Sequence, residues 1–138
     1  MSQAVTGSSM LMTSARLLVV DDDVVVREMF AEALRLEGHT VRTAATAAAA
    51  LDQVAEWRPD AILIDYRMGL INGLGFLYRL RAHESAAHTP VAVITGQVDI
   101  EGTLADECAY LGATVHFKPL RLEALRAIAR GLLIKTVH

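Results

Sequence analysis

Short apolar runs alternate with longer segments of helical periodicity along residues 16–138. A continuous run of four or five apolar residues is typical of a strand buried on both faces of a sheet. Apolar residues at spacings of three and four favour amphipathic helices in the segments between. We expect strands at Leu17–Val20, Thr40–Thr43, Ala61–Ile64, Val91–Ile94 and Thr114–Phe117. We expect helices at Val24–Leu36, Ala47–Trp57, Gly73–Ala82, Asp99–Leu111 and Leu120–Ile134.

Strands that alternate with helices predict an α/β fold with a doubly wound parallel sheet and helices on both faces. The strand order 2-1-3-4-5 would place the first and third strands side by side where the order reverses. The first helix has apolar residues at helical spacing: Val25, Met29, Ala33 and Leu36. The last helix is expected to turn four residues inward: Leu122, Leu125, Ala129 and Leu132.

Composition narrows the class of protein without indicating a function. The chain has 138 residues, of which 53% are hydrophobic, and its net charge is −3. That charge argues against nucleic-acid binding, and no apolar run reaches the roughly 20 residues of a membrane span. The single cysteine, Cys108, excludes an internal disulfide and favours a reducing, cytoplasmic compartment. Residues 1–15 contain no Lys or Arg, which argues against a signal peptide; we expect a flexible tail, with one domain over 16–138.

Polar residues follow the predicted strands where each strand ends. Asp21 and Asp22 follow the first strand, Asp65 the third, Thr95 the fourth and Lys118 the fifth. Because the carboxyl ends of parallel strands share one edge of a sheet, these side chains are expected to converge there.

The converging residue types suit phosphoryl transfer. Two carboxylates about 4 Å apart repel by roughly 4 kcal/mol at an effective dielectric constant near 20, so three together favour a bound cation. Carboxylate oxygens are preferred ligands of Mg²⁺. A carboxylate nucleophile beside a metal, a lysine and a hydroxyl could accept a phosphoryl group as an aspartyl phosphate.

Four segments resemble the receiver domain of two-component response regulators, the CheY-like family. They are LLVVDDDVVVR, AILIDYRMGLINGLGFL, VAVITG and HFKPL. The spacings also fit: 44 residues from Asp21 to Asp65, 30 from there to Thr95 and 23 more to Lys118. The resemblance covers about residues 16–135.

The resemblance implies a role for each matched residue. Asp65 would accept the phosphoryl group, Thr95 would bind it and move when it arrives, and Lys118 would pair with one of its oxygens. Pro119 would hold that loop through a cis peptide bond. The resemblance implies four Mg²⁺ ligands, namely Asp21, Asp22, Asp65 and the backbone carbonyl of Arg67. Asp23 lies outside the matched acidic pair.

Several positions depart from the family pattern. Gly69 stands where the family has proline, and Val115 stands where it often has an aromatic switch residue. The segment from Gly112 to Lys118 is one residue shorter than usual, and His116 or Phe117 could substitute for the missing aromatic residue in part.

The resemblance also implies partners. A histidine kinase or a histidine phosphotransfer protein would donate the phosphoryl group, and a downstream protein target would read the change in surface. Direct nucleic-acid or membrane binding is not expected. A homodimer could form through the predicted helix 99–111, strand 114–117 and helix 120–134. The chain would not be an enzyme, apart from catalysing its own phosphorylation and dephosphorylation. Two interpretations of the whole protein stay open: a stand-alone regulator, or a receiver cut from a larger protein.

Three alternatives remain beside this hypothesis. A degenerate receiver could act as an interaction module without phosphorylation. A haloacid dehalogenase phosphatase also uses an aspartate and Mg²⁺, but this chain has no room for its cap domain. A flavodoxin-like carrier would need a phosphate-binding loop where this chain has an acidic one.

Overall fold

The sheet has the predicted topology. The structure, a computed structural model, describes residues 9–11, 14–96 and 102–136. Its main sheet has five strands, all parallel, in the order β3-β2-β4-β5-β6. The strands are β2 (Arg16–Val20), β3 (Thr40–Ala44), β4 (Ala61–Asp65), β5 (Val91–Thr95) and β6 (Ala113–Phe117). Numbered from β2, this order is 2-1-3-4-5, which confirms the predicted doubly wound α/β fold.

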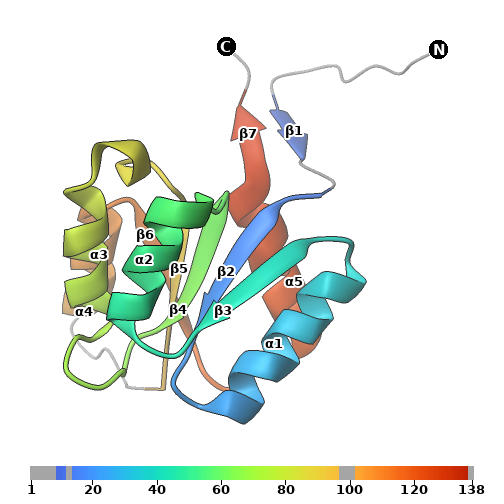
Figure 1. Ribbon diagram of the computed structural model, residues 1–138, viewed down its shortest axis with the longest axis horizontal. Helices are drawn as coiled ribbons and strands as arrows, with labels where there is room; N and C mark the ends of the chain where they lie inside the picture. Colours follow the sequence, from blue (N-terminus) through green and yellow to red (C-terminus); the bar gives the residue numbers. More distant parts are fainter. Residues whose placement is uncertain (1–8, 12–13, 97–101, 137–138) are drawn as a thin grey trace.

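Five α-helices cover the two faces of the sheet. They are α1 (Val24–Leu36), α2 (Ala47–Trp57), α3 (Gly73–Arg81), α4 (Thr103–Tyr110) and α5 (Leu122–Leu133). Helices α1 and α5 lie on one face, and α2, α3 and α4 lie on the other (Figure 1). A short 3₁₀ helix at Glu84–Ala86, which no sequence pattern predicted, precedes β5. Residues 99–101 of the predicted fourth helix lie outside the described residues.

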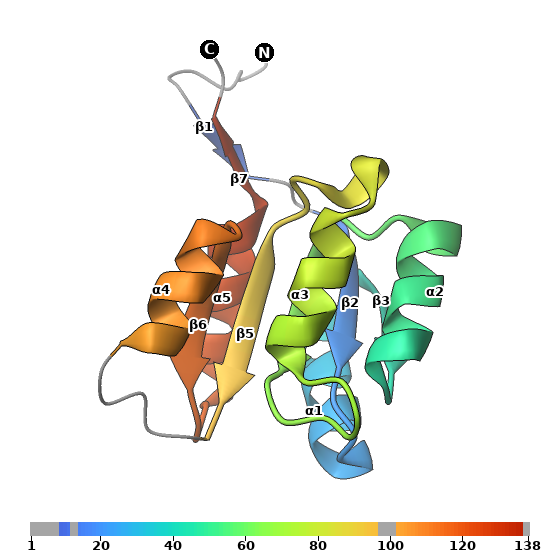
Figure 2. The same ribbon diagram turned by 90° about the vertical axis from the view of Figure 1, so that its left-hand side faces the viewer.

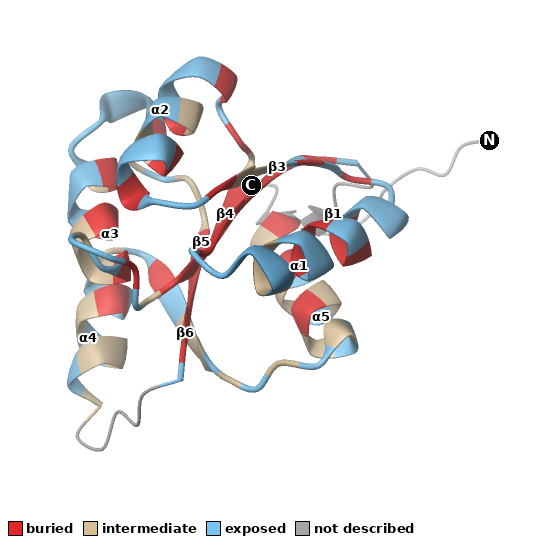
Figure 3. Ribbon diagram, turned by 60° about the horizontal axis from the view of Figure 1, so that its bottom comes forward, coloured by how far each residue is buried: buried red, intermediate tan, exposed pale blue. Residues whose placement is uncertain are grey.

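The core is divided into two layers by the sheet. Strands β4 and β5 are buried at every position, as Figure 3 shows in red for the centre of the molecule. Their side chains alternate between the layers: Ile62 and Ile64 pack with α2 and α3, whereas Leu63 packs with α1 and α5. Burial on both faces explains why these strands are continuous apolar runs in the sequence.

Of the four residues whose spacing indicated α1, Ala33 is buried and the other three are exposed. Val25, Met29 and Leu36 are 68%, 47% and 73% exposed. The buried residues of this helix are Phe30, Ala31, Ala33 and Leu34. Helix α1 has apolar residues on all its sides, so spacing alone does not decide which side is buried. The side that faces the sheet includes Phe30. In α5, Leu125 and Ala129 are buried as predicted, Leu122 and Leu132 are half-buried, and Leu133 completes the buried face.

A small ribbon lies apart from the main sheet. Strand β1 (Ser9–Leu11) pairs antiparallel with β7 (Ile134–Thr136), next to both termini (Figure 2). Residues 9–11 lie in the predicted tail, whose flexibility stays a prediction. Ile134 was predicted to end the last helix but begins β7, so the structure differs there. The boundary between a tail at 1–15 and a domain at 16–138 stays a prediction. None of the helices in the described part of the chain combines the length and apolar character that crossing a bilayer requires.

Candidate functional site

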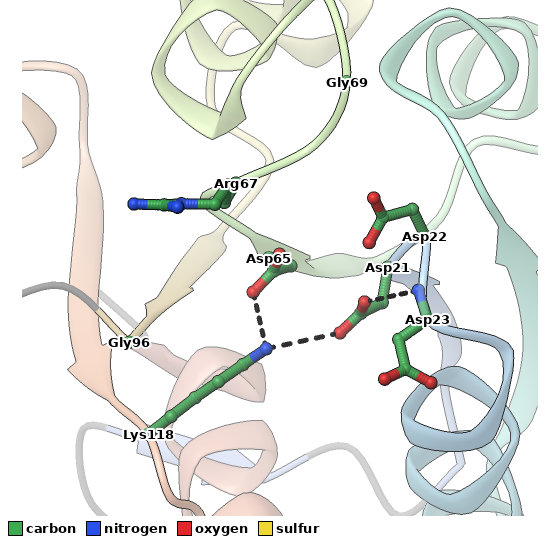
Figure 4. Close-up of a pocket in the computed structure, with 8 residues that line it drawn as sticks. All are labelled: Asp21, Asp22, Asp23, Asp65, Arg67, Gly69, Gly96 and Lys118. Carbon is green, nitrogen blue, oxygen red and sulfur yellow. Dashed lines mark hydrogen bonds and ion pairs between the residues drawn. The ribbon is translucent and has the colours of Figure 1, made fainter.

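Three carboxylates meet at the carboxyl edge of the sheet. Strand β4 ends at Asp65, and Asp21 directly follows β2, the strand beside it. One carboxylate oxygen each from Asp21, Asp22 and Asp65 lies within 4.8 Å of the others. They line a pocket of about 500 Å³ (Figure 4), whose lining residues are Asp21, Asp22, Asp23, Asp65, Arg67, Gly69, Gly96 and Lys118. The predicted convergence of acidic residues is therefore present.

Asp21 is held in place by a backbone N–H and by an arginine side chain. Its side chain is only 4% exposed, and its Oδ1 accepts a hydrogen bond of 2.9 Å from the Asp23 N–H. The guanidinium of Arg27 donates to its carbonyl oxygen at 3.0 Å. Burial raises the pKa of the Asp21 carboxyl above its ordinary value; the Asp23 N–H opposes this, and the charge of Asp65 adds to it. The charged form of Asp21 is therefore less favourable than that of an aspartate in water.

Asp23 has a different task from its two neighbours. It is the N-cap of α1, and its side chain accepts hydrogen bonds from the backbone N–H groups of Val25 and Val26. Such a cap satisfies donors that a helix leaves unpaired in its first turn. In Figure 4 its carboxylate is turned toward the start of α1. Asp23 therefore caps α1 and is not one of the three clustered carboxylates, although it also lines the pocket.

Lys118 faces the carboxylates from the opposite side of the pocket. Its Nζ lies 2.8 Å from Asp65 Oδ1 and 3.8 Å from Asp21 Oδ2 (Figure 4). Partial burial acts to lower the pKa of Lys118, but Asp65 and Asp21 outweigh it, so the pKa stands above its ordinary value. The Lys118–Pro119 peptide bond is cis, as the resemblance implied. The ammonium is thus charged and directed at Asp65.

Thr95 and Arg67 occupy different depths of the site. Thr95 is 1% exposed, and its carbonyl oxygen accepts a hydrogen bond of 2.8 Å from the Lys118 N–H. Of the described residues, eight line the pocket, and Thr95 is not among them. Arg67 is exposed at the rim and does line it. The two residues are therefore near the site, while their predicted contacts with phosphoryl group and metal remain predictions.

Gly73 was not singled out from the sequence, although it lets the end of β4 and α3 approach closely. Its N–H donates to the Tyr66 carbonyl at 2.7 Å. A Cβ at Gly73 would lie 3.0 Å from the Tyr66 Cα and 3.3 Å from the Asp65 carbonyl oxygen, both backbone atoms. The only signal in the sequence is a glycine at the first position of a predicted helix.

The residues that depart from the family pattern lie in the loop before α3 and in strand β6. Gly69 has a positive φ of 51°, and a Cβ there would meet nothing within 4 Å. Val115 is half-buried against α4 and its neighbours, His116 is half-buried, and Phe117 is 48% exposed. The loop at Gly69 therefore has a conformation that glycine adopts easily. Residues 97–101, which follow Gly96, lie outside the described residues.

The donor set at this edge fits a hard divalent cation. Three carboxylates within 4.8 Å supply oxygen ligands and an excess of negative charge. Burial is the main cause of the raised pKa of Asp21, and the negative charges of Asp65 and Asp22 add to it. By the same argument the acidic pocket would repel the phosphate of a flavin nucleotide.

Comparison with known proteins gives a consistent result. A family model described as "Response regulator receiver domain" matches residues 17–130. The response regulator MprA of Mycobacterium tuberculosis is 37% identical over 124 residues, which cover 89% of this chain and 52% of the relative. The chain thus spans about half the length of the curated relatives it matches.

Solved structures give the same match in three dimensions. The chemotaxis response regulator CheY4 of Vibrio cholerae has a TM-score of 0.79 and 30% identity, covering 88% of this chain and all of the other. The receiver domain of NtrX from Brucella abortus has a TM-score of 0.75 and 31% identity, covering 85% and 97%.

Proposed function

Because the chain belongs to the response regulator receiver family, we propose that Asp65 is the residue that accepts a phosphoryl group here. Accepting a phosphoryl group is the function of this family. The observation that carries the assignment is the contact of 2.8 Å between Asp65 Oδ1 and Lys118 Nζ, at the base of a pocket with two further carboxylates. Asp65 is buried on its strand but open to this pocket, so one oxygen is available to a donor.

The metal ligands form the second part of the proposal. Asp21, Asp22, Asp65 and the backbone carbonyl of Arg67 would hold Mg²⁺. When bound, the metal supplies positive charge that offsets the negative charge of phosphoryl oxygens. Lys118 supplies positive charge from the opposite side, and Thr95 would offer its hydroxyl to the arriving group. Asp65 is thereby held in one orientation as the nucleophile.

The proposed reaction exchanges one bond to phosphorus for another. A carboxylate oxygen of Asp65 forms the new O–P bond as the N–P bond of a phosphohistidine breaks, and the released imidazole takes up a proton from solvent. Receiver domains are not classical enzymes. We propose that catalysis by this chain is limited to its own phosphorylation and to hydrolysis of its own aspartyl phosphate.

The surface beside the pocket is suited to binding a protein that donates the phosphoryl group. A hollow lined mainly by apolar groups of α1 and the β6–α5 connection adjoins the acidic pocket, and Lys118 lines both. Val25 and Met29 on α1 add exposed apolar area nearby. A histidine kinase or histidine phosphotransfer protein in the cytoplasm would dock here. A downstream protein target would then bind the changed surface, and α4, β6 and α5 would be the elements of a homodimer if one forms.

Intact mass spectrometry after incubation with acetyl phosphate tests this proposal. With Mg²⁺ the wild-type chain should gain the mass of one phosphoryl group, and with EDTA it should gain none. Asp65→Asn should gain none in either condition. Asp52→Asn, an exposed residue of α2, is the matched control and should behave as wild type. A gain in mass that does not depend on Mg²⁺, or that also occurs in Asp65→Asn, would contradict the assignment.

The same measurement decides the main alternative. A degenerate receiver would remain unlabelled in every condition while keeping its fold. Gly69 and Val115, where the family pattern is broken, motivated that alternative. The intact cluster of Asp21, Asp65 and Lys118 favours phosphorylation instead.

A further inference from the structure

Helix α4 is anchored by less burial than the other helices. Cys108 is its only buried residue, whereas α1, α2, α3 and α5 each bury three or more. Its N-cap is Gly102, which supplies no side-chain hydrogen bond and has a φ of 72°. Gly112 follows the helix with a φ of 74°. Little buried area therefore fixes the position of α4, and a glycine with left-handed backbone stands at each end.

The carboxyl end of α4 is held to α3 by Arg81. The guanidinium donates to the carbonyl oxygens of Leu111 at 2.7 Å and Gly112 at 3.3 Å. It also donates to Ala86 at 3.0 Å and Thr89 at 2.7 Å, in the segment that leads into β5. The two bonds to Leu111 and Gly112 make this end of α4 its fixed end, and the two bonds to Ala86 and Thr89 hold the guanidinium in place.

A hydrogen bond between side chains also joins the middle of α4 to α3. The hydroxyl of Tyr78 on α3 donates a hydrogen bond of 2.9 Å to Glu107 Oε2 on α4. Both helices lie on the same face of the sheet, as Figure 2 shows. Tyr78 is 48% exposed, so the bond can open to water without leaving a buried group unpaired. Helix α4 also packs on β6, and Lys118, the residue after β6, contacts Asp65.

We propose that the Tyr78–Glu107 hydrogen bond is a latch, which holds α4 in its resting position and opposes the phosphorylated arrangement of the Asp65 site. This inference rests on the proposed function. Arg81 fixes one end of α4, the latch fixes its middle, and a change at Lys118 reaches the helix through β6. Phosphorylation would open the latch, so Tyr78 and Glu107 are positioning residues that act through α4. A bond made only in the resting state reduces the affinity for any ligand of the other state.

Beryllofluoride, which mimics a phosphoryl group on aspartate, is the probe. We expect Tyr78→Phe to bind Mg²⁺-beryllofluoride about two- to tenfold more tightly than wild type in calorimetric titration, because one hydrogen bond of the resting state is lost. Glu107→Ala should give the same gain, and the double variant should gain no more than either alone. Glu107→Gln keeps an acceptor for the tyrosine hydroxyl and should retain wild-type affinity. Tyr110→Phe removes a hydroxyl from an exposed tyrosine of α4 and is the matched control.

Each outcome bears on the inference. Equal affinity for wild type and Tyr78→Phe would overturn the latch, as would weaker binding by the variant. An equal gain for Tyr110→Phe would also overturn it, because the effect would then not depend on this contact. If wild type binds no beryllofluoride, the proposed function fails and the latch fails with it. Faster amide hydrogen exchange across α4 in Tyr78→Phe, with an unchanged exchange pattern in β4, would support it.

Discussion

Replacing Asp21 with asparagine should stabilise the metal-free protein. The side chain is buried, and its carboxylate lies within 4.8 Å of those of Asp22 and Asp65. At an effective dielectric constant near 20, each such pair repels by about 3.5 kcal/mol. Lys118, 3.8 Å from Asp21, returns about 4.4 kcal/mol in attraction. Asp22 is exposed and Lys118 is partly exposed, so solvent weakens both terms, and we expect a net gain of about 1–2 kcal/mol.

The shape of the side chain is preserved in this substitution. The asparagine oxygen can accept the Asp23 N–H as the carboxylate does at 2.9 Å, so loss of a hydrogen bond does not mask the effect of charge. Urea unfolding at neutral pH in EDTA measures the free energy of unfolding of both chains. Saturating Mg²⁺ should then stabilise wild type, by about 2.7 kcal/mol at a hundred times its Kd, and Asp21→Asn much less.

Two results would refute this reasoning. A metal-free Asp21→Asn that is less stable than wild type would show that repulsion does not dominate at Asp21. Equal stabilisation of both proteins by Mg²⁺ would show that Asp21 is not a ligand. Asp52→Asn provides the control for removing one negative charge at an exposed position.

Three further predictions use the same unfolding measurement. Burial and Asp65 raise the pKa of Asp21, so the folded protein binds this proton more tightly than the unfolded chain does. Metal-free wild type should therefore lose stability as the pH rises from the ordinary aspartate pKa through the raised one. Asp21→Asn should not show that loss. Gly73→Ala should cost about 1–3 kcal/mol because its Cβ meets backbone, whereas Gly131→Ala in α5, where space is open, should be stabilising by up to about 1 kcal/mol. Arg81→Met keeps the apolar stem but leaves four carbonyl oxygens without the guanidinium, and should cost about 2 kcal/mol; a loss below about 0.5 kcal/mol would contradict its bridging role.

The sequence predicted the sheet because its central strands are unambiguous. Ala61–Ile64 and Val91–Ile94 are continuous apolar runs, and the structure buries both on two faces. Polar residues at the strand ends then had to meet, since parallel strands share one edge. This is why Asp21, Asp65 and Lys118 could be brought together before any coordinates were known.

Other features were beyond the sequence for physical reasons. Tertiary packing decides which face α1 buries, because the sequence offers apolar residues on two faces. Phe30 and Leu34 are buried, whereas Val25 and Met29 are exposed. Strands β1 and β7 have three residues each and pair across almost the whole chain, so local periodicity could not reveal them. The contact between Tyr78 and Glu107 joins residues 29 positions apart, and neither residue type alone indicates it.

The position of the phosphoryl group is the most direct test of the central claim. After reaction with acetyl phosphate and Mg²⁺, borohydride reduction converts an aspartyl phosphate to homoserine, which peptide mass spectrometry can locate. We predict homoserine at residue 65 in the wild-type chain and at no residue in Asp65→Asn. Homoserine at Asp21, Asp22 or any other aspartate, with residue 65 unchanged, would contradict the account.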